Sequence, residues 1–113
     1  MINLHVVNNL PNVPWERYEG EQFRYKFLLP AIENSAPTEK ILIDFDRGYG
    51  YGTGFLKGVF DTPPEDYTRQ EFFDKLEFKS DEEPLLIAEV MTIILDIPLS
   101  DIDIWTKKLK RVK

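Results

Sequence analysis

The sequence contains no cysteine and a single histidine, His5. The absence of cysteine excludes disulfide bonds, thiolate zinc sites and a thiol nucleophile. A transition-metal site would need carboxylates alone, and a histidine-based catalytic triad has no support nearby in the sequence. We therefore interpret His5 as a strand residue with a satisfied hydrogen bond, and we expect no bound metal, no cofactor and no catalytic residue.

Long hydrophobic runs are also missing, since no apolar segment approaches the roughly 18 residues of a membrane span. The N-terminal segment Met1–His5 lacks the basic region and the long apolar region of a signal peptide. These absences predict a cytoplasmic protein that does not enter a membrane.

Basic residues are fewer than acidic ones: 14 Lys and Arg stand against 20 Asp and Glu, a formal net charge of −6. So acidic a chain is not suited to general nucleic-acid binding. The cations gather at the end of the chain, at Lys107, Lys108, Lys110, Arg111 and Lys113. This basic end is either an arm for nucleic acid or an acidic partner, or a helix C-terminus, where the macrodipole stabilises cations.

What the chain does have is enough apolar material for one core: 113 residues, of which 42% are hydrophobic and 13% aromatic. The alternating segments Ile2–Val7 and Leu76–Lys79 predict two strands. The short, β-branched and apolar segment Ile41–Phe45 is typical of a central strand covered on both faces. We expect an α/β (α+β) fold with a small mixed β-sheet and four to five helices.

The helices follow from apolar spacing and capping signals. A first helix should open at Gly20–Phe23, after a loop over 8–14, with Pro30 as a weak point. A short second helix covers 55–60. Capping boxes at Thr68–Glu71 and Ser80–Glu83 predict two more, of which the apolar helix over 85–95 should be the most buried. Ser100 should cap a last amphipathic basic helix, with its apolar stripe formed by Ile102, Trp105, Leu109 and Val112.

The stretch between the central strand and the second helix holds four of the six glycines. It has no lysine after the glycines and no Gly-x-Gly-x-x-Gly pattern, so it is neither a P-loop nor a Rossmann turn. One interpretation is a tight turn in which Thr53 caps the following helix. The other is a partner-binding or modification site formed by Gly50, Gly52, Thr53, Gly54 and Lys57.

Two carboxylates, Asp44 and Asp46, flank Phe45 at the end of the central strand. Strand alternation places them on the same face, where they would bind Mg²⁺, perform acid–base chemistry or cap the adjacent turn. We favour the capping role, and we keep an enzyme that acts through these two residues as a minor alternative.

Four segments together resemble the bacterial and phage STAS-like domain of unknown function: Gly20–Arg24 (GEQFR), Leu28–Ile32 (LLPAI), Ile41–Phe45, and Gly50–Leu56 (GYGTGFL) with Phe60. The resemblance spans roughly residues 2–95 and implies a STAS-like domain over 1–99, followed by the helix over 100–113. The family's typical Ser-Ser pair is replaced here by Thr53-Gly54, and its Glu-Ala by Lys57-Gly58. In STAS domains of anti-sigma-factor antagonists, a partner kinase phosphorylates a serine in this turn, a role that only Thr53 could take.

The leading functional hypothesis is a non-enzymatic, STAS-like regulatory or protein-interaction module. Its protein partner, a kinase-like regulator or a host target, would dock around Gly48–Gly54 and the helix that follows. The alternative is a phage or mobile-element effector that inhibits a host or defence protein by binding it, for which an acidic body suits a basic target. The helix over 100–113 would pack on the domain itself or mediate a homodimer through its apolar stripe.

Overall fold

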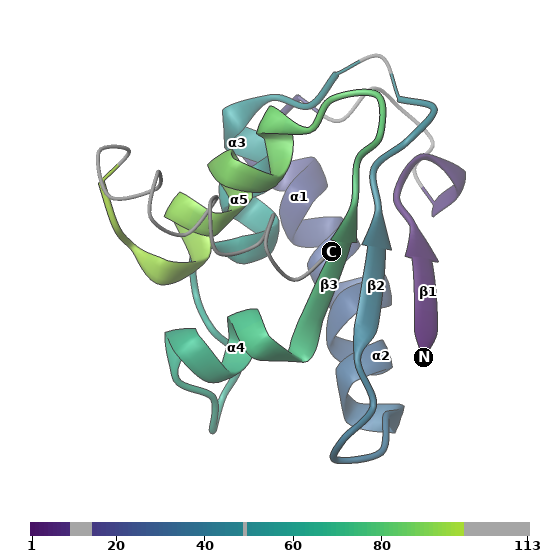
Figure 1. Cartoon of the computed structure of the whole chain (residues 1–113), viewed down its shortest axis with the longest axis vertical. Coiled ribbons are helices and arrows are strands. Elements are labelled where there is room, and N and C mark those ends of the chain that lie inside the picture. The colour runs from purple at the N-terminus through teal and green to yellow at the C-terminus, as the bar shows by residue number, and fades with distance from the viewer. Residues whose placement is uncertain (10–14, 49, 99–113) are drawn as a thin grey trace.

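The computed structural model describes residues 1–9, 15–48 and 50–98. Its sheet has three strands in the order β1 (Ile2–His5), β2 (Ile41–Asp44) and β3 (Leu76–Lys79). Both pairings are parallel, with Ile2 opposite Ile41 and Ile41 opposite Leu76 (Figure 1). The three strands and the central place of β2 agree with the sequence, but the sheet is wholly parallel among the described residues and not mixed.

Parallel neighbours need crossover connections, and here both are helical. The first crossover is one helical stretch made of α1 (Arg17–Phe23), the π-helical turn η2 (Arg24–Leu28) and α2 (Leu29–Asn34). The second contains α3 (Thr53–Phe60) and α4 (Arg69–Lys75), and α5 (Leu85–Leu95) follows β3. The described residues thus hold four helical stretches, besides a 3₁₀ turn at Val7–Asn9 within the predicted loop.

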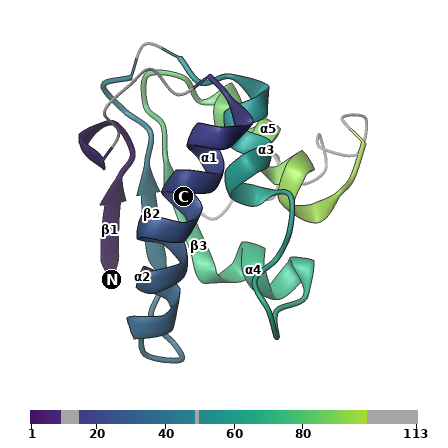
Figure 2. The same ribbon diagram turned by 180° about the vertical axis from the view of Figure 1, so that it is seen from behind.

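Helices α1 and α2 cover one face of the sheet, as Figure 2 shows with both in front of the strands. On that face Ile41 and Ile43 are fully buried. The opposite face carries Asn3, Leu42 and Glu77 in register, and Asn3 and Glu77 are exposed. The expectation that β2 is covered on both faces is therefore wrong for the described residues, because crossovers of the same hand between strands in sequential order fall on the same side.

The core beneath the sheet is aromatic. Phe23, Phe55, Phe60 and Phe72 are the largest fully buried side chains, and they come from α1, α3 and α4. Phe45, directly after β2, lies edge-on to Phe60 with ring centroids 6.3 Å apart. Phe23 of α1 and Phe55 of α3 have ring centroids 6.3 Å apart, and this contact joins the two crossovers into one core.

Helices α1 and α3 cross at glycines. A Cβ atom on Gly20 would overlap the carbonyl oxygen of Phe55, and one on Gly58 would overlap the carbonyl oxygen of Arg17. Gly20 therefore does not open a helix, as the sequence suggested. It lies inside α1, which begins three residues earlier, because only glycine lets the two backbones approach so closely.

The first crossover is irregular one turn before Pro30. The N–H group of Leu29 donates to the carbonyl of Arg24, five residues back, which defines the π turn. Pro30 has no N–H group to donate. The irregularity expected at Pro30 is thus present, but in the turn that precedes it, and it leaves Leu28 and Ile32 both buried in the core.

The end of α3 is held by two arginines from other helices. Arg24, which is buried, donates to the carbonyls of Val59 and Thr62, and Arg69 donates to that of Asp61 at 3.0 Å. Carbonyls in the last turn of a helix have no partner within it, so these guanidinium groups supply the missing donors.

One of the two predicted capping boxes is present. Thr68 Oγ1 accepts from the Glu71 N–H at 3.0 Å, and Glu71 Oε1 accepts from the Thr68 N–H at 2.9 Å. The second box is wrong, since α5 begins only at Leu85 and the Ser80 hydroxyl donates to the Glu83 carbonyl at 2.6 Å.

Helix α5 is also not the most buried helix. Five of the eight residues of α3 are buried, against four of the eleven in α5. Leu85, at the start of α5, is 81% exposed.

Among the described residues, no helix combines the length and apolar character needed to cross a membrane. The helix predicted over 100–113, with Ile102, Trp105, Leu109 and Val112, lies outside the described residues.

Candidate functional site

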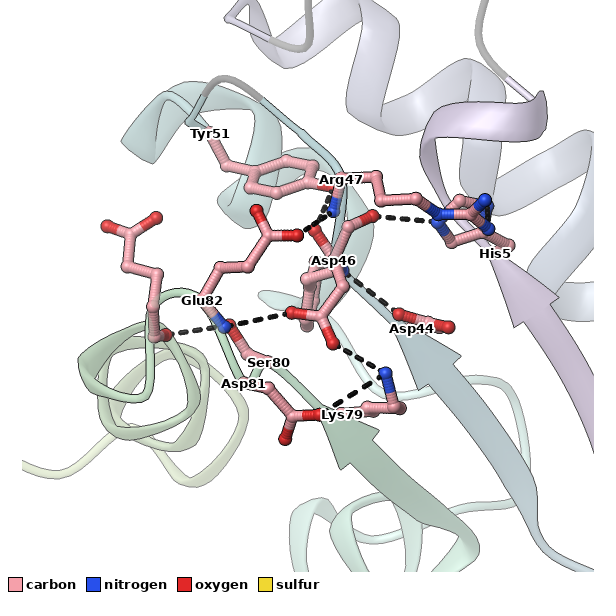
Figure 3. Close-up of polar contacts among 11 residues, drawn as sticks. His5, Asp44, Asp46, Arg47, Tyr51, Lys79, Ser80, Asp81 and Glu82 are labelled. Atoms are coloured by element: carbon pink, nitrogen blue, oxygen red, sulfur yellow. Dashed lines mark hydrogen bonds and ion pairs between the residues drawn. The ribbon is translucent and has the colours of Figure 1, made fainter.

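The carboxyl ends of the three parallel strands meet at one edge of the sheet, and polar side chains gather there (Figure 3). His5 ends β1, Asp44 ends β2 and Lys79 ends β3. Loops leave the sheet at this edge, which is where open parallel sheets usually bind ligands. The glycine-rich turn begins at the same edge, just beyond Asp46.

Asp46 is the centre of this group and is only 7% exposed. One carboxylate oxygen accepts a hydrogen bond from Lys79 Nζ at 2.7 Å, and the other accepts the backbone N–H of Glu82 at 3.1 Å. Lys79 Nζ also lies 3.4 Å from the carboxylate of Asp81. The hydrogen bond with Lys79 is the main reason why the pKa of Asp46 lies below its ordinary value, and it raises the pKa of Lys79.

Asp44 and Asp46 are joined through the backbone. Strand β2 ends at Asp44, and Asp46 follows in the turn. Asp44 Oδ1 accepts the backbone N–H of Asp46 at 2.9 Å, which is the capping role that the sequence favoured for this residue. No group of three or more His, Cys, Asp or Glu side chains is placed to hold a metal ion in the part of the chain that the structure describes.

His5 links β1 to the turn after β2. Its Nε2 lies 2.7 Å from the carbonyl oxygen of Asp46, and its Nδ1 lies 3.4 Å from Nη2 of Arg47. A carbonyl can only accept, so Nε2 donates, and Nδ1 is left to accept from the guanidinium. The interpretation of His5 as a strand residue with a satisfied hydrogen bond is confirmed.

The chain reverses at Arg47, which adopts a left-handed backbone conformation with φ of 67°. Its N–H donates to Glu82 Oε1 at 2.7 Å. Further along, the Tyr51 hydroxyl donates to the carbonyl of Phe45 at 2.8 Å. Burial, followed by the charge of Asp44, raises the pKa of Tyr51, so its hydroxyl is retained as a donor.

The glycines of the turn serve different purposes. Gly50 has φ of 119°, a conformation that side chains disfavour, and no atom of the described residues lies within 4 Å of a Cβ placed there. Gly52 has an ordinary φ, but a Cβ atom there would overlap the carbonyl oxygen of Trp15. That carbonyl accepts the N–H of Phe55 at 3.2 Å, so the segment before α1 occupies one of the free donors at the start of α3.

Thr53 is not the N-cap of α3, as the sequence predicted. The cap position is Gly52, and Thr53 is the first helical residue. Its hydroxyl is 3.0 Å from Glu89 Oε1 on α5 and its side chain is exposed. Lys57 is exposed one turn later on α3, whereas Gly52 is buried beneath Trp15.

Sequence reasoning missed Lys79, Glu82 and Trp15. Lys79 ends β3 and Glu82 follows it. Once three parallel strands are recognised, the end of β3 must lie beside the residues that follow β2. Nothing in the sequence indicates a role for Trp15, because its contact with Gly52 depends on how α1 crosses α3. The site is therefore a preformed turn held by hydrogen bonds from three separate segments.

The geometry defines a parallel α/β domain with a helix-covered sheet and a glycine-rich segment at its carboxyl edge. Residues 19–86 match the family described as "STAS-like domain of unknown function (DUF4325)", which is more than half of the chain. The chain belongs to this family, and the resemblance seen in its motifs is confirmed. The match runs from α1 to the start of α5 and includes the whole turn. Searches of curated proteins and of solved structures found no match.

Proposed function

We propose that this chain is a non-enzymatic interaction module, which binds a protein partner over the glycine-rich turn and the first turn of α3. The observation that carries the proposal is the position of Thr53. Its hydroxyl is exposed at the start of α3 and is joined at the surface to Glu89 of α5. A partner bound there would contact the turn residues Gly50 and Gly54 and the exposed cation Lys57.

The buried groups below the turn support a binding role over a catalytic one. Both carboxylate oxygens of Asp46 accept hydrogen bonds from the chain, and the Tyr51 hydroxyl donates to a backbone carbonyl. An acid–base catalyst needs a group in reach of its substrate, whereas these groups hold the backbone. A turn held in one conformation loses little entropy when a partner binds.

Regulation would act through Thr53. A phosphate on its hydroxyl would add roughly two negative charges beside the Glu89 carboxylate. The contact between α3 and α5 would then become repulsive, and a partner that touches both helices would be released. This interpretation extends to Thr53 the switch that the motif resemblance implied.

The test is affinity capture with the full tagged chain from the source cells, quantified by mass spectrometry. We expect Thr53→Glu to lose a partner that wild type retains, while Thr53→Val, which keeps the shape without charge, retains most of it. Glu77→Gln, on the exposed sheet face, is the matched control. Equal capture by wild type and Thr53→Glu, with unchanged melting curves, would remove the proposal.

The acidic balance of the chain remains the reason for the second candidate, an effector that inhibits a host or defence protein by binding it. The same capture distinguishes the two. A kinase-like or regulatory partner supports the module, and a basic host protein whose activity falls on binding supports the effector.

A further inference from the structure

The outer side of the first crossover and the segment just before it expose three aromatic side chains within eleven residues. Trp15 is 56% exposed, Tyr18 70% and Tyr25 65%. The inner side of the same stretch carries Gly20 and Phe23, which are buried. In Figure 2, α1 lies at the front of the molecule with its outer side turned away from the sheet. Clustered exposed aromatics are a mark of interaction surfaces, since Tyr and Trp are enriched where proteins bind each other.

Two of these aromatics form a stripe on the helix. Tyr18 and Gln22 lie four residues apart on α1, and Tyr25 follows three residues later in the π turn η2, so the three continue along one side of the helical stretch. The side chain of Gln22 is partly exposed between the two tyrosines. The stripe is nearly symmetric about Gln22, with a tyrosine one turn away on each side.

The charges beside the stripe are arranged with opposite signs at its two ends. Glu19 lies three residues before Gln22, and Lys26 lies four residues after it. Within the described segments, neither takes part in an ion pair, whereas Arg17 is already paired with Asp61 at 2.7 Å. An antiparallel copy of the helix, crossing near Gln22, would bring each Glu19 close to the other copy's Lys26 and each Tyr18 close to the other's Tyr25, since both pairs are within one residue of direct opposition.

We propose that a second copy of this chain packs on this face, with the two α1 helices antiparallel about a two-fold axis near Gln22. Self-complementary charge and a symmetric aromatic stripe are what an isologous interface requires. The three aromatics expose about 400 Å² per copy, roughly half of what each partner contributes to a standard interface. The surface therefore suits a reversible dimer whose population rises with concentration.

This inference is independent of the proposed function, because it uses the outer side of α1 and not Thr53 or Lys57. The test is sedimentation velocity with the full chain over a wide concentration range. Wild type should shift from the monomer mass toward twice that mass. Tyr18→Ala combined with Tyr25→Ala should weaken association at least tenfold without changing the circular dichroism spectrum, since both side chains are exposed.

Charge reversal tests the antiparallel arrangement. Lys26→Glu alone should weaken association, and the addition of Glu19→Lys should restore it. Circular dichroism checks that α1 still forms in the double variant, because the Glu16 N–H then loses Glu19 as its acceptor. Leu85→Ala, at the most exposed large apolar side chain of α5, is the control and should leave association unchanged. A wild-type protein that stays monomeric throughout, or a dimer unaffected by loss of both tyrosines, would overturn the proposal. A double reversal that restores nothing would overturn the pairing.

Discussion

Asp46 connects the end of β2 to the segment that follows β3 through hydrogen bonds. The contribution of its charge to stability should be measurable as a dependence of the melting temperature on pH. Because its pKa is lowered in the folded state, chiefly by Lys79, the carboxylate stabilises the fold above the ordinary aspartate pKa of about 3.9. This contribution is lost as the pH falls through the lower folded pKa. Asp46→Asn should therefore melt below wild type at neutral pH, with a difference that disappears in acid.

Thermal melts of both proteins from neutral to acidic pH provide the measurement. Asp81→Asn is the control, since Asp81 also lies near Lys79 but its side chain is 80% exposed. A gap between wild type and Asp46→Asn that persists at the lowest pH would show that the shape of the side chain matters and its charge does not.

Substitution of Gly52 should destabilise the fold through a steric clash and not through backbone strain. Its φ is ordinary, so Gly52→Val would be penalised by collision with the backbone of Trp15 and not by strain at the residue itself. We expect the free energy of unfolding to fall by about 1–3 kcal/mol, as for other overpacked sites. Urea unfolding measures it, and an unchanged midpoint would mean that the segment before α1 can move away from the turn.

The close crossing of helices α1 and α3 predicts whether Gly20→Ala raises or lowers the free energy of unfolding. Helix propensity alone would make Gly20→Ala stabilising by about 1 kcal/mol. The contact with the carbonyl of Phe55 predicts the opposite, a loss of about 1–3 kcal/mol as the helices separate. Chemical unfolding decides between the two, with Glu33→Ala on the exposed part of α2 as the control. A stabilised Gly20→Ala protein would contradict the close crossing.

Elements whose signals are local were predictable from the sequence. The box at Thr68–Glu71 needs only neighbouring residues, and β2 is recognisable from four apolar positions, Ile41, Leu42, Ile43 and Phe45. The start of α1 was missed because Glu16 is not a favoured N-cap residue, although its N–H is satisfied by Glu19 at 3.2 Å.

Elements that depend on distant partners were not predictable in the same way. The box at Ser80–Glu83 has the correct residues, but the Ser80 hydroxyl donates to the Glu83 carbonyl, and the neighbouring Glu82 N–H is bound by Asp46 from another strand end. Likewise, Thr53 loses the cap position to Gly52, which must lie under Trp15. The candidate site was located at the right turn because glycine and threonine are visible locally, whereas Lys79 and Glu82 reach it only through the sheet.

For the whole molecule, deletion of residues 100–113 separates two origins of a dimer. The sequence predicts an amphipathic helix there, and burial of its apolar side chains would contribute about 1.5–3 kcal/mol each before entropy is subtracted. We expect the shortened chain to melt at a lower temperature and to keep its association through α1. If light scattering shows that the deletion halves the mass of a stable dimer, the C-terminal segment is the dimer interface instead.

The parallel order of the strands also governs how the chain can fold. Ile2 pairs with Ile41, and Ile41 pairs with Leu76, so the sheet has no contact between residues close in sequence. A hairpin can form early and guide the rest, but here each strand must wait until a complete helical crossover has closed a long loop. The high contact order of the sheet should make this small protein fold more slowly than a helical bundle of equal length. Until β2 is placed, both edge strands have nothing to pair with.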